Sequence, residues 1–86
     1  MSIGNFKKED IGKRVRLALA VKSITPAEAT RRLKLPQQSS LDGWFNGHIT
    51  VENLSRFSIE FKVNLIWLIY GTGNFDIDYP LPKNLQ

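Results

Sequence analysis

Cysteine is absent from the sequence, and histidine occurs once, at His48. The chain therefore forms no disulfides, and it offers neither thiolates nor a pair of histidines for a metal site. A glycine-rich phosphate loop is also missing, and no candidate nucleophile has a base beside it. From these absences we expect a protein that is not an enzyme and that uses no cofactor, no metal and no small-molecule substrate.

Long apolar runs are missing as well. No segment approaches the roughly 20 residues that cross a membrane, and the N-terminal residues MSIGNFKKED lack the apolar stretch of a secretory signal. We therefore expect a cytoplasmic protein without a membrane partner. Its 86 residues, of which 42% are hydrophobic and 23% charged, fit a single small globular domain with one modest core.

Positive charge is concentrated in the first third of the chain. Residues 1–34 hold nine lysines and arginines against three acidic residues, whereas residues 35–86 hold three basic and five acidic residues. This asymmetry indicates a surface that faces a polyanion such as a nucleic acid. A solvated basic surface without a partner is the alternative.

Apolar spacing and capping residues predict five helices between residues 7 and 70. The first and fourth are predicted at 7–22 and 51–62, where apolar residues recur every three or four positions. A second helix at 26–33 begins at Thr25-Pro26-Ala27-Glu28, in which Thr25 caps the helix, Pro26 occupies its first position and Glu28 closes a capping box. The apolar segment 65–70 forms the fifth helix.

The third helix follows the turn Lys34-Leu35-Pro36, because proline removes a backbone donor and disfavours helical geometry in the residue before it. Either Pro36 opens this helix or Ser39 caps it, and Asn46-Gly47 ends it. The second and third helices, joined by a tight turn, form a helix-turn-helix.

The C-terminal residues follow a different pattern. Phe75, Ile77 and Tyr79 alternate with acidic residues, which predicts an extended strand. We therefore expect an all-α protein: a compact five-helix bundle with a helix-turn-helix over residues 1–73, and an extended tail over 74–86. The tail either adds a strand across a dimer or leads to an effector domain.

Polar side chains that suit DNA recognition begin the third helix. Gln37, Gln38, Ser39 and Ser40 follow the turn directly. A helix fits the major groove, and glutamine can donate and accept hydrogen bonds at once, as in its bidentate pairing with adenine. Gly43 in this helix costs about 1 kcal/mol relative to alanine, which indicates close packing or close approach to DNA. A polar helix end in water is the alternative interpretation.

An ordered set of motifs resembles the Cro/repressor (XRE) family of phage-type, lambda-repressor-like DNA-binding domains. The motifs lie between residues 11 and 73 and include Arg14-Val15-Arg16, Leu33-Lys34-Leu35, Gln37-Gln38-Ser39, Trp44-Phe45-Asn46-Gly47 and the segment 63–71. The resemblance implies a five-helix bundle whose third helix enters the major groove. It also implies homodimers on two-fold operators and a nucleoid-associated location in the cytoplasm.

The resemblance assigns base reading to Gln37, Gln38 and Ser39. The chain holds one residue more than the family pattern between Gln38 and Trp44, so Ser40 and Asp42 are further candidates for base reading, and Asp42 for helix capping. By the same resemblance, the DNA backbone is contacted by Thr25, Pro26, Asn46 and His48. Charge adds further candidates for phosphate contacts, namely Arg14, Arg31, Arg32 and Lys34.

A dimer seam is predicted from the apolar residues near the C-terminus. A domain this small cannot bury every large side chain of the fifth helix and the tail. We expect Trp67 in the core, and we assign to the dimer interface Ile69, Tyr70, Phe75, Ile77 and Tyr79.

The sequence thus predicts a sequence-specific regulator of transcription, expected to be a repressor, whose partners are an operator in double-stranded DNA and a second copy of the chain. The alternative is a protein-interaction module of the same fold: an antitoxin, an antirepressor or a partner of the transcription machinery.

Overall fold

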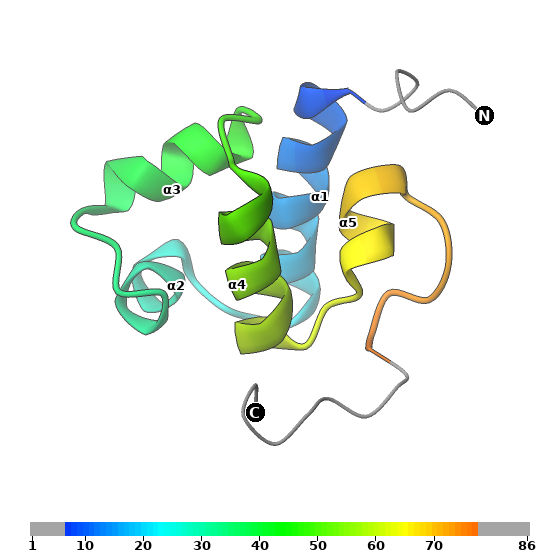
Figure 1. Cartoon of the computed structure of the whole chain (residues 1–86). Coiled ribbons are helices and arrows are strands. Elements are labelled where there is room, and N and C mark those ends of the chain that lie inside the picture. Colours follow the sequence, from blue (N-terminus) through cyan, green and yellow to red (C-terminus); the bar gives the residue numbers. More distant parts are fainter. Residues whose placement is uncertain (1–6, 78–86) are drawn as a thin grey trace.

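The computed structural model describes residues 7–77, which form an all-α bundle of five helices (Figure 1). The helices are α1 (Lys8–Val21), α2 (Pro26–Arg32), α3 (Gln38–Phe45), α4 (Val51–Phe61) and α5 (Leu65–Tyr70). The predicted fold class is therefore confirmed. None of these helices is long and apolar enough to span a membrane.

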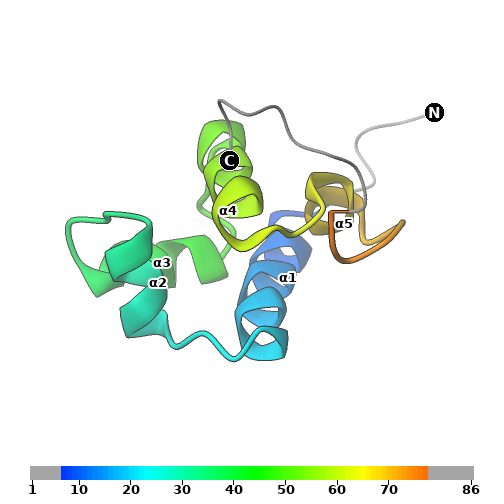
Figure 2. The ribbon, with the colours of Figure 1, turned by 90° about the horizontal axis from the view of Figure 1, so that it is seen from below.

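Helices α1 and α4 lie at the centre of the bundle. Seen from the front and from below, α2 and α3 lie on one side of this pair and α5 on the other (Figures 1 and 2). The core is formed by apolar side chains from all five helices, and its largest fully buried members are Val15, Leu41, Phe57, Val63 and Leu68. The helix-turn-helix is thus attached to one flank of the core, with α5 on the opposite flank.

Side-chain caps fix the starts of three helices. The Thr25 hydroxyl accepts a hydrogen bond from the Glu28 backbone N–H (3.1 Å), and the Thr50 hydroxyl accepts one from Asn53 N–H (3.1 Å). The side-chain oxygen Oδ1 of Asn64 accepts one from Ile66 N–H (2.9 Å). The carboxylate of Glu28 lies 3.5 Å from an Arg32 nitrogen, so this side chain pairs along the helix rather than closing the predicted capping box.

Helix α3 begins at Gln38, between the two predicted starts. Gln37 is its N-cap residue and has extended backbone angles, because the chain must cross from the end of α2 to the start of α3 before it can turn helical. Lys34 takes up the left-handed conformation (φ 56°), which allows Leu35 N–H to donate to Thr30 O (3.0 Å) and so closes α2. The turn is therefore built by backbone geometry at Lys34 as well as by Pro36.

Residues 75–77 run antiparallel to the link between α4 and α5 and form one isolated β-bridge, between Val63 and Asp76. Asn64 N–H donates to Phe75 O (2.7 Å), and Ile77 N–H donates to Lys62 O (3.2 Å). The predicted extended conformation is present up to residue 77, but the described residues contain no strand. The pairing stays short because the partner segment is only the short connection between two helices. Tyr79 lies outside the described residues.

Candidate nucleic-acid interface

The N-terminal end of α3 carries the predicted base-reading side chains on the surface of the protein. Gln37, Gln38 and Ser39 are exposed, as is Asp42 one turn later, whereas Ser40 is half-buried. The opposite side of the helix is buried through Leu41 and Trp44. Helix α3 is therefore amphipathic, with an apolar side in the core and a polar side toward solvent.

The described part of the tail does not cover this polar surface. Residues 75–77 are hydrogen-bonded to the link between α4 and α5. Figure 1 shows this segment on the α5 side of the bundle, across the molecule from α3. Within residues 7–77, the glutamine and serine side chains are thus exposed to solvent.

Helix α1 holds the C-terminal end of α3 through contact between backbones. A Cβ atom built on Gly12 would lie 2.2 Å from Phe45 O and 2.8 Å from Gly47 N, and one built on Gly47 would lie 2.5 Å from Lys8 O. The Arg16 guanidinium also lies over the ring of Phe45, 5.1 Å from its centroid. Such close contact fixes the position of α3 on the bundle.

The residues that the resemblance assigns to contacts with the DNA backbone lie at the start of α2 and just after α3. Thr25 and Pro26, at the start of α2, are exposed. Asn46 and His48, in the loop after α3, are exposed too. His48 N–H donates to Gly43 O (2.9 Å), which ties this loop to the last turn of α3.

Two of the four basic candidates remain open to solvent. Arg31 and Lys34 are exposed, and neither makes an ion pair with any residue between 7 and 77. Arg31 lies in α2 and Lys34 in the turn that leads to α3. Their charges are available to an anionic partner.

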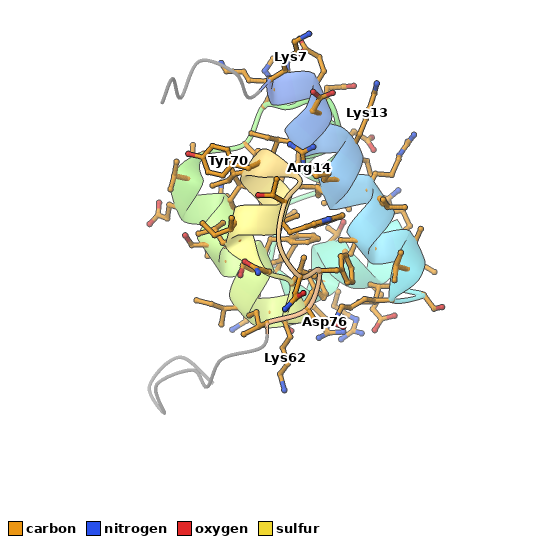
Figure 3. The ribbon with its side chains drawn as sticks, turned by 90° about the vertical axis from the view of Figure 1, so that its right-hand side faces the viewer. Lys7, Lys13, Arg14, Lys62, Tyr70 and Asp76 are labelled. Carbon is orange, nitrogen blue, oxygen red and sulfur yellow. The ribbon has the colours of Figure 1, made fainter. Side chains whose placement is uncertain are left out.

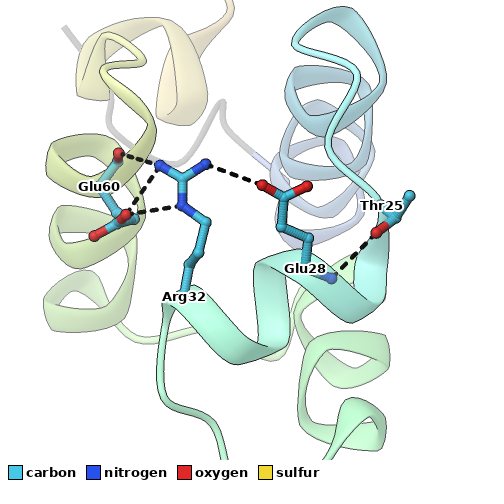
Figure 4. A network of polar contacts seen from close by, with 4 residues as sticks. All are labelled: Thr25, Glu28, Arg32 and Glu60. Atoms are coloured by element: carbon cyan, nitrogen blue, oxygen red, sulfur yellow. Dashed lines mark hydrogen bonds and ion pairs between the residues drawn. The ribbon is translucent and has the colours of Figure 1, made fainter.

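The other two basic candidates form hydrogen bonds and ion pairs with other residues of the protein. Arg14 donates through Nε to Leu68 O and through Nη2 to Ile69 O, both at 2.8 Å, so its guanidinium binds carbonyl oxygens at the C-terminal end of α5 (Figure 3). Arg32 lies 3.0 Å from the Glu60 carboxylate and 3.5 Å from that of Glu28 (Figure 4). Both arginines therefore join helices to one another.

Further residues that hold the helix-turn-helix were missed in the sequence. Arg56 of α4 donates to the backbone oxygen of Leu33, the C-cap residue of α2, and to Asn53 Oδ1 (3.2 Å). The Glu60 carboxylate forms an ion pair with Arg32. The Arg32 guanidinium also lies 4.7 Å from the ring centroid of Phe61. The Glu28 to Arg32 spacing of four residues could have indicated a pair along α2. Nothing local in the sequence indicates Glu60 as the partner across helices.

The residues assigned to a dimer seam differ in exposure. Tyr70 is 41% exposed, whereas Ile69, Phe75 and Ile77 are half-buried. Phe75 packs edge-on against Trp67, with ring centroids 4.7 Å apart. Trp67, expected in the core, is itself half-buried, and Leu68 is the fully buried residue of α5. Ile66, which was not assigned to the seam, is 51% exposed.

Residues 7–77 contain no cluster of three or more side chains of the kind that bind metals. Comparisons with protein-family models, with curated proteins and with solved structures gave no match. The function of the exposed surface of α3 must therefore be argued from its own side chains.

Proposed function

We propose that this protein is a sequence-specific double-stranded DNA-binding protein that regulates transcription as a repressor, with α3 in the major groove. The observation that carries the proposal is the polar N-terminal end of α3, where Gln37, Gln38 and Ser39 are exposed on a helix whose other side is held in the core. A side chain that reads a base edge has to be both accessible and held in position.

The size of α3 suits this role. A helix with its side chains is about 10–12 Å in diameter, which matches the width of about 12 Å of the major groove in B-DNA, so α3 can lie in the groove. Gln37 and Gln38 provide amide groups that can pair with adenine, and Ser39 can donate to or accept from several bases. Asp42, on the same polar side, can accept from the amino group of cytosine.

Phosphate contacts are assigned to groups that border α3. Arg31 and Lys34 offer exposed charge, and the neighbouring Asn46 and His48 offer hydrogen-bonding groups. Arg14 and Arg32 are left out of this set because their guanidinium groups bind atoms of the protein. Contacts of this kind position a protein on the duplex without selecting a sequence.

A homodimer on a two-fold operator is part of the proposal. The exposed Ile66 and Tyr70 lie one turn apart on α5, on the opposite side of the bundle from the helix-turn-helix. A two-fold contact through α5 would place the two copies of α3 at opposite ends of the dimer. For both copies of α3 to enter the major groove on the same side of the duplex, the half-sites should lie about 34–36 Å apart, one turn of DNA.

The experiment is selection of DNA from a random pool by the purified protein, followed by binding measurements at several salt concentrations. We expect enrichment of a two-fold sequence and a steep loss of affinity as salt rises. Gln37→Ala and Gln38→Ala should each reduce affinity for the selected site by about 1–3 kcal/mol and relax base preference. Arg31→Ala should weaken binding to all sequences alike.

Lys62→Gln is the matched control for Arg31→Ala, because Lys62 is also exposed and basic but lies at the C-terminal end of α4. It should leave affinity almost unchanged. Equal effects of the glutamine and arginine substitutions would contradict the division between base reading and phosphate binding. Failure of the unaltered protein to enrich any sequence would refute the proposal and favour the protein-interaction module.

A further inference from the structure

Gly43 differs from the other glycines between residues 7 and 77. Gly12 is required because α1 contacts the backbone at Phe45. The other three have positive φ angles of 93°, 76° and 83°, at Gly47, Gly71 and Gly73, a conformation that other residues rarely adopt. Gly43 has neither explanation, since a Cβ atom built on it would meet nothing within 4 Å.

A glycine in this position destabilises the free protein. Gly43 lies inside α3, a helix of only eight residues, and glycine is less favourable than any residue except proline in a helix interior. Alanine would fit the space and the backbone, so the fold itself gives no reason for glycine.

The position of Gly43 on α3 suggests where that reason lies. It follows Ser39 by four residues, so the two lie one above the other on the same side of the helix. Leu41 and Trp44 face the core. The exposed Asp42 and Asn46 form the row next to Ser39 and Gly43 on one side, and the half-buried Ser40 lies on the other side. Gly43 is therefore half-buried but open toward solvent, on the same side of α3 as Ser39.

We propose that Gly43 determines how deeply α3 enters the major groove, and that Ser39 can reach a base edge only because no side chain stands at position 43. This inference rests on the proposed function. The Ser39 hydroxyl is a single bond beyond its Cβ atom, so it contacts a base only when the helix backbone lies close to the groove floor. A methyl group one turn away would meet the base pairs first and hold the helix outward.

The test compares Gly43→Ala with the unaltered protein, using the DNA selected by the latter. Thermal unfolding should show a higher midpoint for the variant, because alanine stabilises the helix. Affinity for the selected site should fall at least about tenfold, while the weak binding to unrelated DNA stays the same, because that binding depends on phosphate contacts. Higher stability together with weaker selective binding would distinguish a contact with DNA from damage to the fold.

Ser55→Ala is the matched control. Ser55 lies in α4, outside the helix-turn-helix, and its replacement also raises helix propensity. It should raise the midpoint without changing DNA affinity. A double-mutant cycle adds a second measurement: Ser39→Ala should lower selective affinity in the unaltered protein but have little effect when Gly43 is already alanine.

The outcomes separate the two proposals. If the unaltered protein selects a DNA sequence and Gly43→Ala binds it equally well or more tightly, the depth inference is wrong and the proposed function stands. Additive effects of the Ser39 and Gly43 substitutions would also overturn the inference. If the unaltered protein selects no sequence, both proposals fail together.

Discussion

Replacement of Gly12 by alanine should destabilise the protein, although alanine is the better helix residue. The added Cβ would lie 2.2 Å from Phe45 O, whereas ordinary contact begins at 3.4 Å. It would also lie 2.8 Å from Gly47 N. Both atoms belong to the backbone, so no side-chain rotation relieves the clash and α1 must move away from the end of α3.

The expected magnitude follows from two opposing effects. Alanine in the interior of α1 gains about 1 kcal/mol of helix propensity over glycine. Overpacking typically costs about 1–3 kcal/mol. We expect a cost at or above the top of that range, because the added Cβ clashes with two backbone atoms, Phe45 O and Gly47 N. We therefore expect a net loss of about 2 kcal/mol in the free energy of unfolding, or roughly 10 °C in Tm for a domain of this size.

The assay is urea denaturation followed by far-ultraviolet circular dichroism. Gly43→Ala is the matched control, because the chemical change is the same but the added methyl meets nothing within 4 Å. That variant should gain about 1 kcal/mol. A change of less than about 0.5 kcal/mol for Gly12→Ala, or a gain, would refute the close approach of α1 to the end of α3.

The other predictions concern residues that hold helices in place. Arg14→Met should cost about 2 kcal/mol in unfolding free energy, because two charge-assisted hydrogen bonds to carbonyl oxygens of α5 are lost, and Arg14→Lys should recover only part of it. Equal stability of all three proteins in chemical denaturation would contradict this role. Thr25→Ala should cost about 1 kcal/mol through loss of the cap on α2, whereas Thr25→Ser, which keeps the hydroxyl, should cost much less. A serine variant as unstable as the alanine variant would show that the hydroxyl does not act as the cap.

The helices could be predicted because their signals are local. Thr25 and Pro26 determine the start of α2, and the three-and-four spacing of apolar residues in α1 and α4 determines which side of each helix enters the core. The start of α3 could not be predicted as well. Pro36 and Ser39 are both acceptable helix starts, but the helix uses neither, because Gln37 has extended backbone angles and becomes the N-cap residue.

The candidate site divides in the same way. The exposure of Gln37, Gln38 and Ser39 was expected from their place after the turn, and the structure places all three at the surface. The sequence did not show which basic side chains are free to bind a partner and which pair with other residues of the protein. Arg31 and Arg32 are neighbours of the same type, yet Arg31 faces solvent and Arg32 contacts Glu60, a residue 28 positions away.

The sequence alone determined an all-α chain of five helices with a polar start to the third, because helix propensity, capping and amphipathic spacing act between residues a few positions apart. Only the tertiary structure decided which arginines are free to bind a partner and which are used to join helices, since that depends on carbonyl and carboxylate groups brought near from distant parts of the chain. The tertiary structure also decided which glycines are required by a close neighbour. At Gly12 a neighbouring backbone occupies the space that a Cβ atom would need, whereas at Gly43 that space is open. No local sequence pattern indicates this difference.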